Sequence, residues 1–273
     1  MAAVNVTPDS FYDGGRYLGA EAAAGHVDDL IEQGADIIDI GGESTRPGAE
    51  PVAPAEQIAR IEPVVEHAVK RGALVSIDTT RPEVAERMLR LGAHVINDTS
   101  CLADNELAQV TARHGGALVI MHSRGPMSRM PGFSQYPDDA YDDVVADLLQ
   151  EWSAARERAV AAGMPRGDVL LDPGLGFAKN ARHSYEVLTR LAELGRARAR
   201  IVVGPSRKSF IATADPAPPE ARLGGTIAAC LLAVQRGASV LRVHDLRDVR
   251  QALAVAHAAQ MTPSPGQAEV RHA

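Results

Sequence analysis

Gly72-Ala-Leu-Val-Ser-Ile-Asp78 and Gly92-Ala-His-Val-Ile-Asn97 decide the fold of this chain. In each stretch, a glycine suited to end a helix precedes a short apolar run, and the run stops at a polar residue. Residues 81 to 91, between the two stretches, have the apolar spacing of a helix. Short apolar runs separated by helices suit strands that are buried on both faces of a parallel sheet.

The same alternation recurs along the whole chain. Apolar runs stop at a polar residue at eight places: Asn5, Asp39, Asp78, Asn97, His122, Asp172, Ser206 and His244. Helical spacing lies between and after them, at about residues 20–34, 54–71, 81–91, 104–114, 138–162, 180–194, 222–236 and 245–260. Eight alternations predict an α/β fold, a (β/α)8 TIM barrel with eight parallel strands, since a doubly wound open sheet usually has fewer strands.

The length of 273 residues suits one large domain. We expect residues 1–261 to form this domain, and residues 262–273, which contain prolines and a glycine, to form a disordered tail. Because the strand ends of a parallel barrel lie at one rim, we expect the polar residues to form an enzyme pocket there.

Composition limits the class of partner. The net charge is -7 and the pI is about 5.7, and no basic stripe outweighs the acidic residues. A nucleic-acid or membrane-surface partner is therefore not expected. With 45% apolar residues the chain can bury a full core, and a small molecule is the expected partner.

The cysteines and the first residues indicate the compartment. Cys101 and Cys230 lie far apart without a Cys-x-x-Cys spacing, so they are interpreted as reduced core thiols rather than as a disulfide or a zinc site. The start, Met1 to Asn5, lacks the pattern of a signal peptide, and no apolar run approaches membrane-spanning length. We expect a cytoplasmic protein.

Asp78, Asn97 and Asp172 are candidates for binding a heterocycle. They end apolar runs, so they can converge on one small volume. Two carboxylates and an amide suit a ligand edge rich in N–H donors, such as the amino-pyrimidinone edge of a pterin or guanine. Metal binding is the competing interpretation, but these runs supply no histidine close by. The turn Asp172–Lys179 adds two glycines, which let the backbone approach a flat ligand.

A second group is positively charged. Ser206-Arg207-Lys208-Ser209 follows the seventh run and enters a helix, and Arg242 and His244 end the eighth. The loops after the last two strands of such barrels commonly bind phosphate, and a helix N-terminus adds N–H donors.

Two polar loops complete the rim. Gly41–Gly48 is rich in glycine with Arg46 near its tip, and Asn5–Gly15 follows the first run. Such loops can fold over a substrate and exclude water. Asp39 is interpreted as a support for the loop that follows it.

Taken in order, these motifs resemble those of the dihydropteroate synthase family, bacterial folate-pathway enzymes with a TIM barrel. The resemblance covers most of the chain, and so many ordered matches make chance implausible. The matching motifs are Asn5–Phe11, Asp39–Gly48, Ser76–Thr79, Ile96–Asp98, Met121-His122, Asp172–Lys179, Ser206–Ser209 and Arg242–Asp245.

The resemblance implies that 6-hydroxymethyl-7,8-dihydropterin diphosphate condenses with 4-aminobenzoate, with Mg2+ assisting the departure of diphosphate. It implies a homodimer and a catalytic group of Asp78, Arg46 and Lys208. The implied pterin site is Asp78, Asn97, Met121, Asp172, Lys208 and Arg242. The implied diphosphate site is Asn5, Arg242 and His244, with Asn5 near Mg2+. The implied 4-aminobenzoate site is Thr45, Arg46, Pro47, Phe177, Lys208 and Ser209.

Two alternatives stay open at this point. A methyltetrahydrofolate-type pterin methyltransferase shares strand-end acceptors for the pterin, but it has no need of the Ser206–Ser209 and Arg242–His244 motifs for diphosphate. A non-catalytic pterin-binding paralogue is the other, and the intact motifs after the first and second runs argue against it.

Overall fold

A computed structural model describes residues 1–7, 16–44, 50–125, 132 and 134–261. The predictions for Thr45, Arg46, Pro47 and the tail 262–273 fall outside these residues, as do residues 126–131 and 133 of the loop after His122.

The strands are short and parallel. Their bounds are β1 Ala2–Asn5, β2 Ile38–Gly41, β3 Val75–Asp78, β4 Val95–Asp98, β5 Ala117–Met121, β6 Val169–Asp172, β7 Val202–Val203 and β8 Val240–Leu241. Each strand from β1 to β5 pairs in parallel with the next, and β7 pairs with β8. Three of these strands, β1, β3 and β6, end at the polar residue that the sequence marks, and the other five end within three residues of it.

Backbone bonds at two seams close the sheet into a barrel. Between β6 and β7 the Leu171 amide donates to the Arg200 carbonyl at 2.9 Å, and Leu171 bridges Ile201. Between β8 and β1 the Ala3 amide donates to the Val243 carbonyl at 3.0 Å, and Ala2 bridges Val243. The predicted barrel of eight parallel strands is confirmed, although its last two strands are only two residues long.

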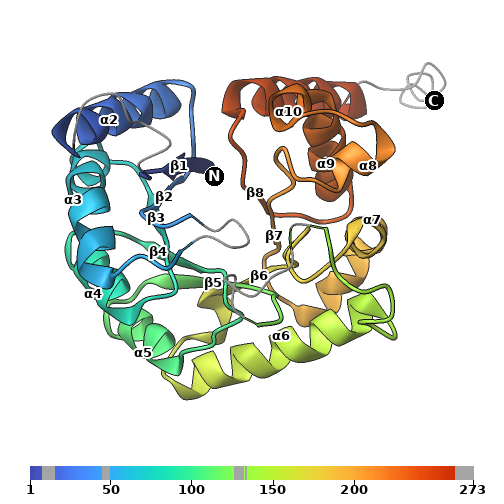
Figure 1. Cartoon of the computed structure of the whole chain (residues 1–273), viewed down its shortest axis with the longest axis horizontal. Coiled ribbons are helices and arrows are strands. Elements are labelled where there is room, and N and C mark those ends of the chain that lie inside the picture. Colours follow the sequence, from blue (N-terminus) through green and yellow to red (C-terminus); the bar gives the residue numbers. More distant parts are fainter. Residues whose placement is uncertain (8–15, 45–49, 126–131, 133, 262–273) are drawn as a thin grey trace, which may run out of the picture.

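Helices surround the strands (Figure 1). Their bounds are α2 Arg16–Glu32, α3 Pro54–Lys70, α4 Pro82–Arg90, α5 Asn105–Arg113, α6 Val144–Ala161, α7 Ala181–Thr189, α8 Ile211–Ala214, α9 Leu223–Gln235 and α10 Leu246–Met261. In the described part of the chain, 3-10 segments accompany them: η2 Arg166–Asp168, η3 Leu191–Ala197 and η4 Pro219–Ala221. Within the described ranges, none of the helices has the length and apolar character needed to cross a membrane.

Two helical predictions needed correction. The helix expected from residue 138 begins at Val144, because the Asp143 carboxylate caps the Val145 and Ala146 amides at 2.9 and 3.0 Å. The short helix α8, in the connection after β7, was not predicted.

The core lies mainly between the strands and the helices, and Trp152 of α6 is its largest fully buried side chain. The Trp152 indole Nε1 donates to the Ile120 carbonyl of β5 at 3.0 Å, which anchors α6 on the sheet. Inside the barrel, Val95, Val119 and Val202 form a separate apolar cluster.

Replacing Trp152 by Phe is expected to lower the free energy of unfolding by about 1–3 kcal/mol, because it deletes this hydrogen bond and buried volume. Urea denaturation followed by circular dichroism measures the change. Leu74→Ala just before β3, where Leu74 is 44% exposed, is the control and should stay within about 0.5 kcal/mol of wild type. Equal stability of Trp152→Phe and wild type would contradict the anchoring role.

Candidate active site

Strand alternation decides which side chains face the inside of the barrel. Residues two apart on a strand face the same side, so Val95 and Asn97 of β4 point inward together, as do Val119 and Met121 of β5. On each of these two strands the inward residue nearer the start, Val95 or Val119, is apolar and belongs to the internal cluster. The position at the strand end carries the side chain that faces the mouth.

Arg242 connects three strands at this mouth. Its Nε donates to the Asp39 carboxylate of β2 at 2.6 Å, and its Nη2 donates to the Asp78 carboxylate of β3 at 2.9 Å. The side chains of Asp39 and Asp78 are 0% and 6% exposed, so both carboxylates depend on this guanidinium for compensation.

Asp39 is not a loop support, and this interpretation was wrong. Its carboxylate accepts from the Ser76 hydroxyl at 2.6 Å and from the Asn97 amide at 3.3 Å, in addition to Arg242. Asp39 therefore belongs to a group of hydrogen-bonded polar side chains at the base of the mouth. This group, which we call the polar floor, consists of Asp39, Ser76, Asp78, Asn97 and Arg242. The sequence did contain a signal for this inward position. Asp39 is a charged residue two positions before the end of an apolar strand, and strand alternation turns a side chain at that position toward the inside of the barrel.

Asp39 also orients Asn97. Since a carboxylate only accepts hydrogen bonds, the Asn97 NH2 group turns toward Asp39, and its carbonyl oxygen is left for a ligand donor. Burial raises the pKa of Asp78, and Arg242 opposes this rise. The floor thus combines acceptors with one guanidinium.

The loop after β6 holds Asp172. The Asp172 carboxylate accepts from the Gly174 amide at 2.7 Å, and burial raises its pKa while the Lys208 ammonium opposes the rise. Gly174 has φ +64°, and a Cβ there would lie 2.2 Å from the His122 carbonyl oxygen. Glycine is therefore required for the loop to pass this close to β5.

Lys208 lies over the Phe177 ring, with its Nζ 4.4 Å from the ring centroid and 2.7 Å from the Leu175 carbonyl oxygen. Burial, followed by Arg242, lowers the pKa of Lys208 to about 8, against the effect of Asp172. Met121 packs with Phe177 in a small apolar cluster. These contacts form an aromatic and cationic wall beside Asp172.

The remaining predicted residues lie at the same rim. Asn5 is half-buried at the end of β1. The Ser209 hydroxyl is 2.8 Å from the Ser134 hydroxyl. The His244 Nδ1 is 3.0 Å from the Ser206 hydroxyl, and His244 is exposed at the rim.

Arg207 was counted in the cationic group, and the structure does not bring it to this group. Its guanidinium forms a salt bridge with Asp245, the residue after His244. The paired charge is better placed to fix the connection after β7 to that after β8 than to bind an anion.

A cavity of about 530 Å3 opens beside Asp78, lined by residues of the loops after β2, β3 and β4 together with Gly125. Among the described residues no group of three or more His, Cys, Asp or Glu side chains could hold a metal ion. Sequence reasoning missed Lys179, which is fully buried behind the loop after β6, as a partner of His122.

Fold and site together define an enzyme with a closed parallel barrel, whose mouth offers buried acceptors to a donor-rich heterocycle and cations to an anionic group. Residues 1–244 match the family described as pterin binding enzyme, and the chain belongs to this family.

Its relatives are dihydropteroate synthases. The enzyme of Mycobacterium leprae is 42% identical over 262 residues, covering 93% of this chain and 91% of the relative. The structure of Xanthomonas albilineans dihydropteroate synthase with 4-aminobenzoic acid has 40% identity, a TM-score of 0.88 and coverage of 96% and 93%. The structure of the same enzyme with 7,8-dihydropteroate has 37% identity, a TM-score of 0.84 and coverage of 96% and 94%.

Asp39→Asn is expected to destabilise the protein by roughly 3 kcal/mol, since it removes one of the two carboxylates that compensate buried Arg242. Chemical denaturation measures the loss. Asp36→Asn, an exposed position just before β2, is the matched control and should have little effect. If both variants unfold like wild type, Asp39 does not hold the polar floor.

Proposed function

We propose that the chain condenses 6-hydroxymethyl-7,8-dihydropterin diphosphate with 4-aminobenzoate, giving 7,8-dihydropteroate and diphosphate. The observation that carries this proposal is the meeting of Asp78, Asn97 and Asp172 with Lys208 and Arg242 at one barrel mouth. Membership of the family agrees with it, as do the related structures of dihydropteroate synthase that hold 4-aminobenzoic acid or 7,8-dihydropteroate.

For the pterin, the Asn97 oxygen and the carboxylates of Asp78 and Asp172 would accept from the N–H groups of the ring edge. Lys208 would donate to the ring carbonyl. Met121 and the guanidinium of Arg242 would lie on opposite faces of the ring. The short contacts of Arg242 to two buried carboxylates support this role, because they hold the guanidinium before substrate arrives.

For the diphosphate, Arg242, His244 and Asn5 are the proposed partners. As the C–O bond to diphosphate breaks, the CH2 carbon develops cation character that the pterin ring delocalises and Asp78 stabilises. Arg242 offsets the negative charge that develops on the leaving group, which is stabilisation of the transition state.

The proposed side for 4-aminobenzoate is Thr45, Arg46, Pro47, Phe177, Lys208 and Ser209. The ring would lie against Phe177, and Ser209 would donate to the carboxylate. The aryl amine is neutral at pH 7 and forms the new C–N bond through its lone pair, then loses one proton to water. No general base is needed before attack.

We propose Mg2+ as the metal. When bound, the ion would neutralise charge on the departing diphosphate. The described residues fit it, because Mg2+ keeps several waters and takes one or two protein oxygens beside substrate phosphates, and Asn5 offers one such oxygen at the rim.

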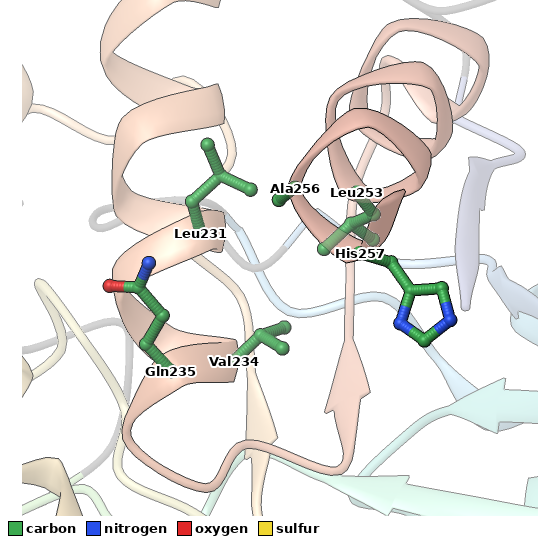
Figure 2. A pocket seen from close by; sticks show the side chains of 6 residues that line it. All are labelled: Leu231, Val234, Gln235, Leu253, Ala256 and His257. Carbon is green, nitrogen blue, oxygen red and sulfur yellow. The ribbon is translucent and has the colours of Figure 1, made fainter. Parts of the chain in front are cut away.

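A homodimer through α9 and α10 is also proposed. Helix α9 is apolar nearly all round, which suits burial on every side, yet its Leu232 and Val234 are 38% and 42% exposed. Beside them α9 and α10 enclose a groove of about 250 Å3 (Figure 2), lined by Leu231, Val234, Gln235, Leu253, Ala256 and His257. A second copy would cover this face. Sedimentation that gives only monomer at micromolar concentration would contradict the proposal.

We further propose a cytoplasmic location. Cys101 and Cys230 are both free thiols, as expected for a reducing compartment. Fractionation of the cells that produce the protein tests this, and recovery outside the cytoplasm would exclude it.

Purified protein with both substrates and Mg2+ is expected to form dihydropteroate and release diphosphate in equal amounts, measured by chromatography and a phosphate assay. Asp172→Asn should weaken pterin diphosphate binding at least about tenfold in calorimetry, because it replaces a charged acceptor. Asp168→Asn, exposed before the start of β6, is the control. Absence of product from the wild-type protein would refute the proposed reaction.

The pH dependence should report Lys208. With a pKa of about 8, its ammonium is present below that pH and lost above it, so kcat/KM should fall as the pH rises through about 8. Lys208→Arg keeps its charge and should move this limb to higher pH, even at reduced activity. Lys70→Arg, exposed on α3, should keep the wild-type profile. An unmoved limb in Lys208→Arg would assign it to another group.

A further inference from the structure

Lys179 is a fully buried lysine that the proposed reaction does not use. Its Nζ lies 2.8 Å from the His122 Nδ1 and 3.2 Å from the Phe177 carbonyl oxygen. Burying an ammonium costs free energy unless the group is well paired, so we expect a buried lysine beside the active site to have a role.

The hydrogen-bond order follows from what each group can donate. The Lys179 ammonium donates to His122 Nδ1, and the His122 Nε2–H donates to the Glu151 carboxylate of α6 at 3.1 Å. Burial, followed by the charge of Lys179, lowers the pKa of His122 to about 4, which agrees with a neutral imidazole. Arg124 holds Glu151 with a bidentate ion pair. Hydrogen-bond donation therefore runs in one direction, from Lys179 through His122 to Glu151.

This chain of contacts ends on the loop that carries Phe177. Lys179 holds the Phe177 carbonyl, and the Tyr141 hydroxyl holds the next carbonyl, that of Ala178, at 2.8 Å. Ala178 has φ +47°, a strained value for a residue with a side chain, so the loop needs external contacts to keep this shape. The Arg124 Cζ lies 3.8 Å from the centroid of the Tyr141 ring. Because Arg124 also pairs with Glu151, it connects the Tyr141 contact to the contacts of Lys179, His122 and Glu151.

Phe177 in turn faces the chemistry. Its ring supports the Lys208 ammonium at 4.4 Å and packs with Met121. Any shift of the Phe177 backbone would move this ring, whereas Asp172 is held separately at the strand end by its own bonds to the His122 and Gly174 amides.

We propose that Lys179, His122 and Glu151 form a positioning relay, which fixes the Phe177 backbone and thereby the surface on which the aromatic amine substrate lies. The inference rests on the proposed function and deepens it. The three residues act from behind the loop and touch no substrate themselves.

Steady-state kinetics separate this role from general stability. Lys179→Met, which keeps an unbranched side chain but removes the ammonium, should raise KM for 4-aminobenzoate about tenfold or more. Binding of pterin diphosphate, measured by calorimetry, should change less than about threefold. Equal losses for both substrates, or no change for either, would overturn the relay.

Two substitutions of His122 test the direction of the contacts. His122→Asn places an oxygen acceptor near the position of Nδ1 and should retain most of the affinity for 4-aminobenzoate. His122→Leu removes the acceptor and should resemble Lys179→Met. Glu157→Gln, exposed on α6 and paired only with neighbouring arginines, is the control that should match wild type. If His122→Asn and His122→Leu are equally impaired, the acceptor is not what matters.

Hydrogen exchange gives a readout that does not depend on catalysis. In Lys179→Met the amides of residues 175–180 should exchange at least tenfold faster than in wild type, while the strands stay protected. Unchanged protection of this segment, or a uniform increase along the whole chain, would refute the relay even if the protein proved inactive. Loss of the reaction in wild type with the exchange result intact would refute only the proposed function.

Discussion

Arg242 makes the interaction on which the rest of the site depends. Its guanidinium compensates two carboxylates, Asp39 and Asp78, that are almost entirely out of water. Without it both would be uncompensated in the barrel, at a cost of several kcal/mol. The contact also joins β8 to β2 and β3, close to the seam where only a few backbone bonds close the barrel. Binding chemistry and barrel closure therefore share one side chain.

The two faces of each strand have different roles. Inward positions place apolar side chains low in the barrel and polar ones at its mouth, as Val95 and Asn97 do on β4. Met121 faces the mouth, and the next residue, His122, faces the other way into the packing with α6. A substrate surface and its support can thus come from adjacent residues on one strand.

Charge balance limits what the mouth can bind. Asp39, Asp78 and Asp172 lie beside Arg242 and Lys208, so the charges of these side chains largely offset one another. The acceptors suit a neutral ring edge that is rich in donors. An anionic group fits nearer the rim, beside His244 and Asn5, where water can still reach it.

Local pattern in the sequence determined the strands, the position of their ends to within three residues, and most helices, because burial and capping depend on neighbouring residues. Asp78, Asn97 and Asp172 could be named for this reason. Tertiary structure alone decided which strand-end side chains meet. It turned Asp39 inward onto Arg242, paired Arg207 with Asp245 away from the site, and placed Lys179 on His122. These contacts join residues far apart in the chain, and their partners follow from the closure of the barrel, which no local pattern encodes.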